Sequence, residues 1–127
     1  MGLYDQVLIK DNHRRLWGAR GLGLAVHTAR CRCPGVPVEV EVETEAELER
    51  ALAARPDWIL LDNMTPDRLR RCVHLCRGRC QLEASGGITL ANVKAVADAG
   101  VQAISLGCLT HSAPAADLSL EISDANP

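Results

Sequence analysis

The sequence has very few aromatic residues: two Trp, one Tyr and no Phe among 127 residues. Proteins that stack single-stranded bases need aromatic platforms, so this scarcity argues against such a surface. Basic residues are not in excess either, because 14 Lys and Arg stand against 16 Asp and Glu, for a net charge of −2. A basic surface is the usual mark of a nucleic-acid-binding protein, so we expect no nucleic-acid partner.

Long hydrophobic runs are also missing, and no apolar stretch approaches the roughly 20 residues of a membrane span. Asp5 and Lys10 interrupt the apolar stretch near the N-terminus, which argues against a signal peptide. We therefore expect a cytoplasmic protein with no membrane partner. Free thiols are the rule in that reducing compartment, and no common zinc spacing fits the cysteines. Cys72, Cys76 and Cys80 recur every four residues and are interpreted as packed thiols on one helix face.

Short apolar runs alternate with amphipathic segments along the chain, and the length suits one domain. The runs predict strands at residues 3–10, 36–42, 58–62, 80–84 and 101–106. Helices are predicted over 13–29 and after three N-cap candidates, Thr44, Thr65 and Thr89. Such alternation is typical of an α/β fold with a parallel sheet and helices outside it. A complete eightfold barrel needs about 250 residues, so the chain is either a small open sheet or part of a barrel.

Polar residues or glycines follow each predicted strand, and α/β proteins place their sites at that edge of the sheet. Gly86 and Gly87, before a predicted helix start, and Gly107, after the last strand, predict a backbone cradle for phosphate. His111 lies in a short loop, where it can donate to a phosphate or carry a proton. The candidate binding residues at this edge are Lys10, Ser85, Gly86, Gly87, Gly107 and His111.

Glu39, Glu41 and Glu43 alternate with valines, so the three carboxylates share one face of a strand. Two interpretations follow from this spacing. The strand can lie at the edge of the sheet with a wet acidic face. Alternatively, the carboxylates form a ring that holds Mg²⁺ or sugar hydroxyls, with Asp62 joining from the next strand.

Five motifs then occur in order: LIKDNH at 8–13, VEVEVE at 38–43, LLDNM at 60–64, EASGGITL at 83–90 and LGCLTHSAPAADLSL at 106–120. In combination they resemble the C-terminal part of quinolinate phosphoribosyltransferase, also called carboxylating nicotinate-nucleotide pyrophosphorylase. The resemblance implies an incomplete TIM-like α/β barrel of parallel strands over residues 1–122. The tail at 123–127 is expected from the sequence to be frayed. The resemblance also implies transfer of a phosphoribosyl group from phosphoribosyl pyrophosphate to quinolinate with Mg²⁺. The products are CO₂, pyrophosphate and nicotinate mononucleotide, and the mononucleotide feeds NAD synthesis.

The resemblance also implies roles for individual residues. Lys10 matches the lysine that meets a quinolinate carboxylate, and it is expected to be a catalytic residue. Glu41 and Asp62 match the acidic pair near the ribose and its Mg²⁺, as catalytic residues and as metal ligands. The residues matched to the 5′-phosphate are Ser85, Gly86, Gly107 and His111.

Members of this family are longer than the present chain, and we expect the family's N-terminal domain to be absent. The arginine and histidine residues that clamp quinolinate are expected to be absent with it. The isolated chain is therefore expected to be weakly active or inactive. We expect it to form homo-oligomers, or to associate with the missing N-terminal half, because its first strand exposes an edge. Two other interpretations stay open: a molybdenum-transport-like protein of the same fold, and a non-catalytic module for phosphate binding or assembly.

Overall fold

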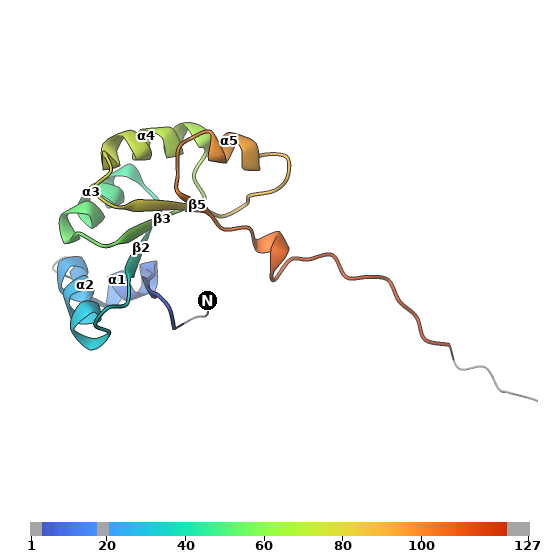
Figure 1. Ribbon diagram of the computed structural model, residues 1–127, viewed down its shortest axis with the longest axis horizontal. Coiled ribbons are helices and arrows are strands. Elements are labelled where there is room, and N and C mark those ends of the chain that lie inside the picture. Colours follow the sequence, from blue (N-terminus) through green and yellow to red (C-terminus); the bar gives the residue numbers. More distant parts are fainter. Residues whose placement is uncertain (1–3, 18–20, 122–127) are drawn as a thin grey trace, which may run out of the picture.

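The computed structural model describes residues 4–17 and 21–121, in which strands and helices alternate (Figure 1). The strands are β1 (Val7–Ile9), β2 (Val38–Val42), β3 (Trp58–Asp62), β4 (Gln81–Ser85) and β5 (Ala103–Ile104). The helices are α1 (Asp11–Trp17), α2 (Gly21–Arg32), α3 (Glu45–Ala54), α4 (Pro66–Cys76) and α5 (Val93–Ala97), followed by a 3₁₀ helix at Gly107–Leu109. None of the helices in these ranges is long and apolar enough to cross a membrane.

The five strands form one parallel sheet in the order β1-β2-β3-β4-β5. The sheet is open, so β1 and β5 are its edges. Helix α2 packs against β1 and β2, α3 packs against β2, and neighbouring helices contact each other (Figure 1). The predicted fold class, a partial α/β barrel of alternating units, is confirmed.

The two faces of the sheet differ in chemistry because side chains alternate along each strand. Val38, Val40 and Val42 are fully buried in the hydrophobic core. Burial of such side chains is the main favourable term in folding, at roughly 25 cal/mol per Å². The opposite face, which we call the inner face, carries Glu39 and Glu41 in β2. It also includes the side chains that lie beside them on the neighbouring strands. The predicted split between valines and glutamates in this strand is therefore confirmed.

Two predicted N-caps are confirmed. The Thr44 hydroxyl accepts the Glu47 N–H at 3.2 Å and begins α3. The Thr65 hydroxyl accepts the Arg68 N–H at 3.4 Å, and Pro66 is the first residue of α4. These residues satisfy backbone donors that the first turn of a helix leaves free.

Two predicted helices differ from the structure. The helix expected over 13–29 is two helices, α1 and α2, on either side of residues 18–20, which lie outside the described residues. Thr89 does not cap α5, which begins only at Val93. Instead, the Asn92 side chain accepts the Thr89 N–H at 2.8 Å and holds a turn there. The tail predicted at 123–127 also lies outside the described residues, whereas residues 113–121 are exposed and extend away from the sheet (Figure 1).

Asp57 joins the amino-terminal ends of three elements. Its carboxylate accepts the Val38 N–H at 2.9 Å and an Arg30 N–H at 3.2 Å. Its backbone carbonyl accepts the Gln81 N–H at 3.1 Å. Burial raises the pKa of Asp57, but the donors from Val38 and Arg30 outweigh burial, and the net pKa is lowered. The carboxylate therefore adds stability above its unfolded-state pKa and loses it as the pH falls.

We expect Asp57→Ala to lower the free energy of unfolding by about 2 kcal/mol at neutral pH, because the buried Val38 N–H loses its acceptor. Urea denaturation followed by circular dichroism measures this loss. Asp67→Ala is the matched control, since the Asp67 carboxylate is exposed and pairs with Arg70 in its own helix. Equal denaturation midpoints for the two variants would contradict the role of Asp57.

Candidate functional site

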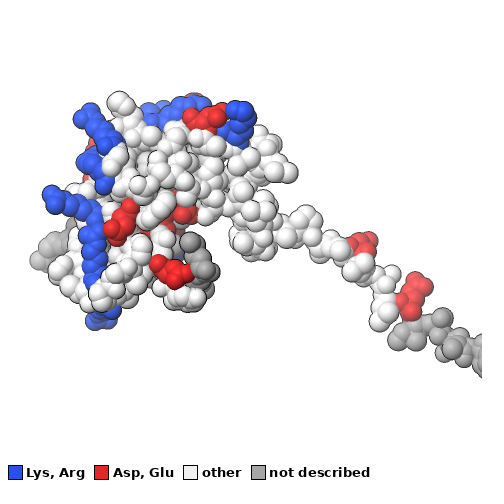
Figure 2. Space-filling view, viewed as in Figure 1, with Lys and Arg blue, Asp and Glu red and all other residues white. Residues whose placement is uncertain are grey.

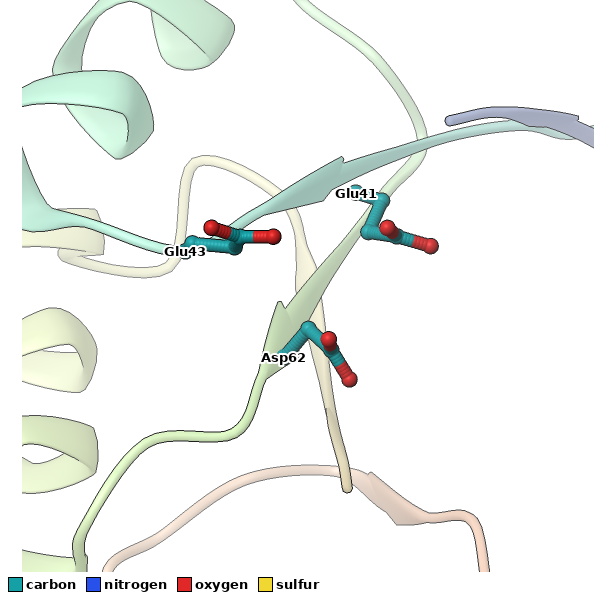
Figure 3. Close-up of side chains that lie close together, drawn as sticks. All are labelled: Glu41, Glu43 and Asp62. Atoms are coloured by element: carbon teal, nitrogen blue, oxygen red, sulfur yellow. The ribbon is translucent and has the colours of Figure 1, made fainter. Parts of the chain in front are cut away.

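Three carboxylates converge where β2 and β3 end. Glu41 lies in β2, Glu43 directly follows that strand, and Asp62 is the last residue of β3. One oxygen of each lies within 4.8 Å of the others, and all three side chains lie on the same side of the strands (Figure 3). The structure thus brings Glu41 and Asp62 together, as the spacing predicts, while their roles stay predictions. The carboxylate ring predicted from the spacing included Glu43, which the structure places in this group, and Glu39, which lies outside the group of three.

Lys10 reaches the same group from the end of β1. Its ammonium Nζ lies 3.4 Å from Oε2 of Glu41. The side chain of Lys10 is 55% exposed, whereas that of Glu41 is only 10% exposed, so the lysine stays open to a ligand from solvent. The Lys10 backbone N–H donates to Nδ1 of His13 at 3.1 Å, which holds the start of α1. The lysine and the carboxylates therefore lie together at the carboxyl ends of the strands.

Further from the carboxyl ends of the strands, the inner face is buried and acidic. Glu39 is 5% exposed, and Gln6 donates to its Oε2 at 2.7 Å. Its Oε1 has no hydrogen-bond partner among the described residues. Burial, and then the charges of Glu83 and Glu41, raise the pKa of Glu39 to about 7. This carboxyl therefore keeps its proton to a higher pH than an exposed glutamate does.

The alternative that β2 is an edge strand with a wet acidic face is wrong. Strand β2 pairs with β1 on one side and with β3 on the other. Both Glu39 and Glu41 are also buried. Sequence reasoning also missed Glu83 and Ser105 on this face, where the Ser105 hydroxyl donates to the Glu83 carboxylate. The alternation of Glu83 with Ser85 in β4 was the signal for the first of them.

The loop after β4 lies against the loop after β3. Ser85 pairs with Asp62 in register, and its carbonyl accepts the Asn63 N–H at 2.9 Å. Asn63 in turn donates its side-chain amide to Asp62 at 2.8 Å. Gly86 has φ +88°, and a Cβ atom there would lie 2.3 Å from Oδ1 and 2.8 Å from the backbone N of Asn63. Gly86 thus allows the two loops to touch beside the carboxylates.

The phosphate cradle predicted at this loop needs one correction. No helix begins directly after Gly86 and Gly87, because α5 starts at Val93 and has only five residues. The prediction that a helix N-terminus contributes to phosphate binding at this loop is therefore wrong. The backbone of Ser85, Gly86 and Gly87 stays the predicted phosphate-binding element.

Gly107 and His111 belong to a small loop after β5. The Gly107 carbonyl accepts the N–H groups of Thr110 at 3.1 Å and Ser112 at 3.0 Å. The His111 ring lies so close to Gly107 that a Cβ atom there would be 2.6 Å from Nε2. His111 is exposed, and its Nδ1 lies 2.8 Å from the Ser112 hydroxyl. The contacts of His111 are thus within its own loop, and its predicted role in phosphate binding is untested.

The charges are distributed unevenly over the surface. On the face drawn in Figure 2, Lys and Arg side chains gather over the helices, and acidic side chains lie among them and on the extended C-terminal segment. Arginines of α4 pair with acidic residues on the helical side of the sheet. Arg68 and Arg71 each lie 3.2 Å from the carboxylate of Glu45 in α3. These basic side chains are on the helical side, whereas Lys10 pairs with the carboxylate group.

Solved α/β proteins of other families share this arrangement. The 3-keto-L-gulonate-6-phosphate decarboxylase from Vibrio cholerae superposes with a TM-score of 0.62 at 19% identity, over 80% of this chain and 50% of that chain. A likeness at such low identity concerns the fold alone. Fold and site together define an α/β-barrel protein, of which this chain forms part of the barrel, with an acidic site at the carboxyl ends of its strands.

Within that class, the family model for "Quinolinate phosphoribosyl transferase, C-terminal domain" matches residues 1–121. The chain belongs to this family. It is 42% identical to the probable nicotinate-nucleotide pyrophosphorylase [carboxylating] of Bacillus subtilis, over 98% of this chain and 43% of that protein. It is 37% identical to the mitochondrial quinolinate phosphoribosyltransferase [decarboxylating] 2b of Nicotiana tabacum, over 96% of this chain and 40% of that protein.

Solved structures agree with this family assignment. The nicotinate-nucleotide pyrophosphorylase from Ehrlichia chaffeensis superposes with a TM-score of 0.78 at 36% identity, over 87% of this chain and 40% of that chain. The enzyme from Francisella tularensis gives a TM-score of 0.76 at 38% identity, over 86% of this chain and 37% of that chain. The chain thus spans about two fifths of the length of the relatives that it matches.

Proposed function

We propose that this chain carries the ribose-phosphate side of a phosphoribosyl transfer to quinolinate. The reaction joins quinolinate to phosphoribosyl pyrophosphate and releases CO₂ and pyrophosphate, giving nicotinate mononucleotide for NAD synthesis. The observation that carries the proposal is the group formed by Lys10, Glu41, Glu43 and Asp62 at the carboxyl edge of the sheet, in a chain of this family.

The proposed chemistry explains why carboxylates are needed there. Departure of pyrophosphate leaves positive charge on the anomeric carbon of the ribose. Carboxylates fixed beside that carbon stabilise the developing charge, and fixed groups of this kind supply much of the rate enhancement in enzymes. Glu41 and Asp62 suit this role because the strands hold them in place. Lys10 then faces an anionic substrate from the same edge.

The same carboxylates fit Mg²⁺. Magnesium prefers carboxylate oxygens and is usually bound by one or two of them together with substrate phosphates. Glu41, Glu43 and Asp62 offer three such oxygens within 4.8 Å of one another. When bound, Mg²⁺ would neutralise charge on the leaving pyrophosphate. Within this proposal, Glu41 and Asp62 are its ligands and Glu43 lies close enough to assist them.

Calorimetry of the purified chain with phosphoribosyl pyrophosphate, with and without Mg²⁺, tests the proposal. We expect binding that depends on Mg²⁺ and becomes weaker by about tenfold or more in Asp62→Asn, because one carboxylate ligand is lost. Asp67→Asn is the matched control, since that carboxylate lies on α4 and pairs with Arg70. Binding that ignores Mg²⁺, or that Asp62→Asn leaves unchanged, would contradict the assignment.

A turnover assay separates the enzyme from a binding module. Quinolinate is added to the same mixture and nicotinate mononucleotide is measured. Product formation that Asp62→Asn abolishes would show that the chain catalyses the reaction alone. Mg²⁺-dependent binding without product would assign this chain the ribose-phosphate side only, with quinolinate held by other residues.

A further inference from the structure

Two cysteines that the proposed reaction does not use lie in contact at the other end of β4. Cys76 is the last residue of α4 and is 2% exposed, and Cys80 directly precedes β4 and is half-buried. Their sulfur atoms are 3.6 Å apart, and the Cys76 thiol lies 3.5 Å from the Cys80 carbonyl oxygen. The helix ends before Cys80, so the prediction that Cys72, Cys76 and Cys80 share one helix face is wrong for Cys80.

The backbone between them turns so tightly that the sulfurs meet. Arg77 has φ 51° and Gly78 has φ 71°, so both residues adopt the left-handed conformation that ends a helix. The Arg79 guanidinium donates to the carbonyls of Leu75 and Cys76, which holds the turn against α4. The cysteines are thus brought together by a turn that is itself fixed by hydrogen bonds.

A reagent can reach the pair from one side. Cys80 lines a surface hollow at the amino-terminal ends of the strands, together with Trp58 and Arg79. The carboxylate group lies at the opposite ends of the same strands. The two sites are therefore separated by the length of the sheet, and a change at the cysteines need not alter the carboxylates.

We propose that Cys76 and Cys80 form a modification site, a thiol pair that a two-electron oxidant converts to an intramolecular disulfide. Each thiol loses one hydrogen and one S–S bond forms. With hydrogen peroxide as the oxidant, the O–O bond breaks and the two electrons and two protons leave as two molecules of water. The disulfide links the end of α4 to the start of β4. Closure requires the two sulfurs to approach from contact distance to bonding distance, which is a small movement of side chains.

At neutral pH Cys80 is held in its thiol form. Burial, and then the neighbouring Cys76 thiol, raise the pKa of Cys80 to about 12, although the Arg79 charge acts in the opposite direction. Thiolates, not thiols, react with oxidants. A test therefore belongs at mildly alkaline pH, where more of the reactive form is present.

Peptide mapping of the folded chain after treatment with diamide tests the proposal. Free thiols are alkylated, and the chain is then digested with trypsin, which cleaves after Arg77 and Arg79. The disulfide would join the tryptic peptides 72–77 and 80–94, and their combined mass would be lower by two hydrogens. Because Cys72 lies in the first peptide, Cys72→Ala should keep the link, and Cys76→Ala should abolish it.

The linked peptides in the wild type and in Cys72→Ala are the expected result. Separate peptides with alkylated Cys76 and Cys80, in a sample whose exposed Cys31 and Cys108 have been oxidised, would overturn the proposal. A link that persists in Cys76→Ala would also overturn it, because Cys80 would then have paired with Cys72. The wild-type map does not depend on any variant folding.

Discussion

Replacing Gly86 by alanine is expected to lower the free energy of unfolding by about 3 kcal/mol, through backbone strain and overpacking together. The residue has φ +88°, a conformation that alanine rarely adopts. An added Cβ would also lie 2.8 Å from the backbone N of Asn63, and a backbone atom cannot move aside as a side chain can. Two loops beside the carboxylate group would have to separate, so Mg²⁺-dependent ligand binding should weaken as well.

Gly87→Ala separates the two causes. Gly87 also has a positive φ, +62°, but nothing lies within 4 Å of the position where its Cβ would be. This variant should therefore show the backbone strain alone, about 1 kcal/mol. Urea denaturation of both variants at one pH gives the comparison. Equal losses would mean that contact with Asn63 does not set the requirement for glycine at position 86.

Stability is expected to fall as the pH rises from 4.5 to about 7, to the extent that Glu39 controls it. In this range the folded chain holds a proton on Glu39 that the unfolded chain has released, so raising the pH favours unfolding. The stabilising effect is fully present below the unfolded-state pKa and is lost as the pH passes through the folded-state pKa. The raised pKa corresponds to about 3 kcal/mol over the whole range.

Glu39→Gln tests this expectation because an amide cannot ionise. Other groups act in the opposite sense: hydrogen bonds from Arg68 lower the pKa of Glu45 to about 2. The informative quantity is therefore the difference in unfolding free energy between wild type and variant, measured at several pH values. That difference should shift in favour of the variant as the pH rises. Glu49→Gln, on the exposed side of α3, is the control, and a Glu39→Gln profile parallel to the wild type would refute the role of Glu39.

Local chemistry made much of the fold predictable. Thr65 followed by Pro66 marks a helix start by itself, since the hydroxyl and the fixed φ of proline act within one turn. Alternation of valine and glutamate likewise separated the two faces of β2. The start of α5 was not predictable in this way, because the Asn92 side chain accepts the Thr89 N–H within a turn and the helix begins only at Val93.

The site was predictable in its members and not in its electrostatics. Parallel strands bring their carboxyl ends together, so Glu41 and Asp62 could be placed side by side from spacing. The raised pKa of Glu39 depends on burial between two neighbouring strands and on Glu83, which is 44 residues further along the chain. No local pattern contains that information. Gly86 shows the same limit: sequence reasoning assigned it to a ligand, and its contact with Asn63 appears only when the loops are folded.

The edges of the sheet are short, which affects how copies of the chain can meet. Strand β1 has three residues and β5 has two, whereas each of the three inner strands has five. An exposed strand edge is a template for aggregation because its free N–H and C=O groups can pair with another chain. Edges of two or three residues offer few such groups. Strand addition of the kind that builds amyloid thus has few backbone groups to pair with at the described edges.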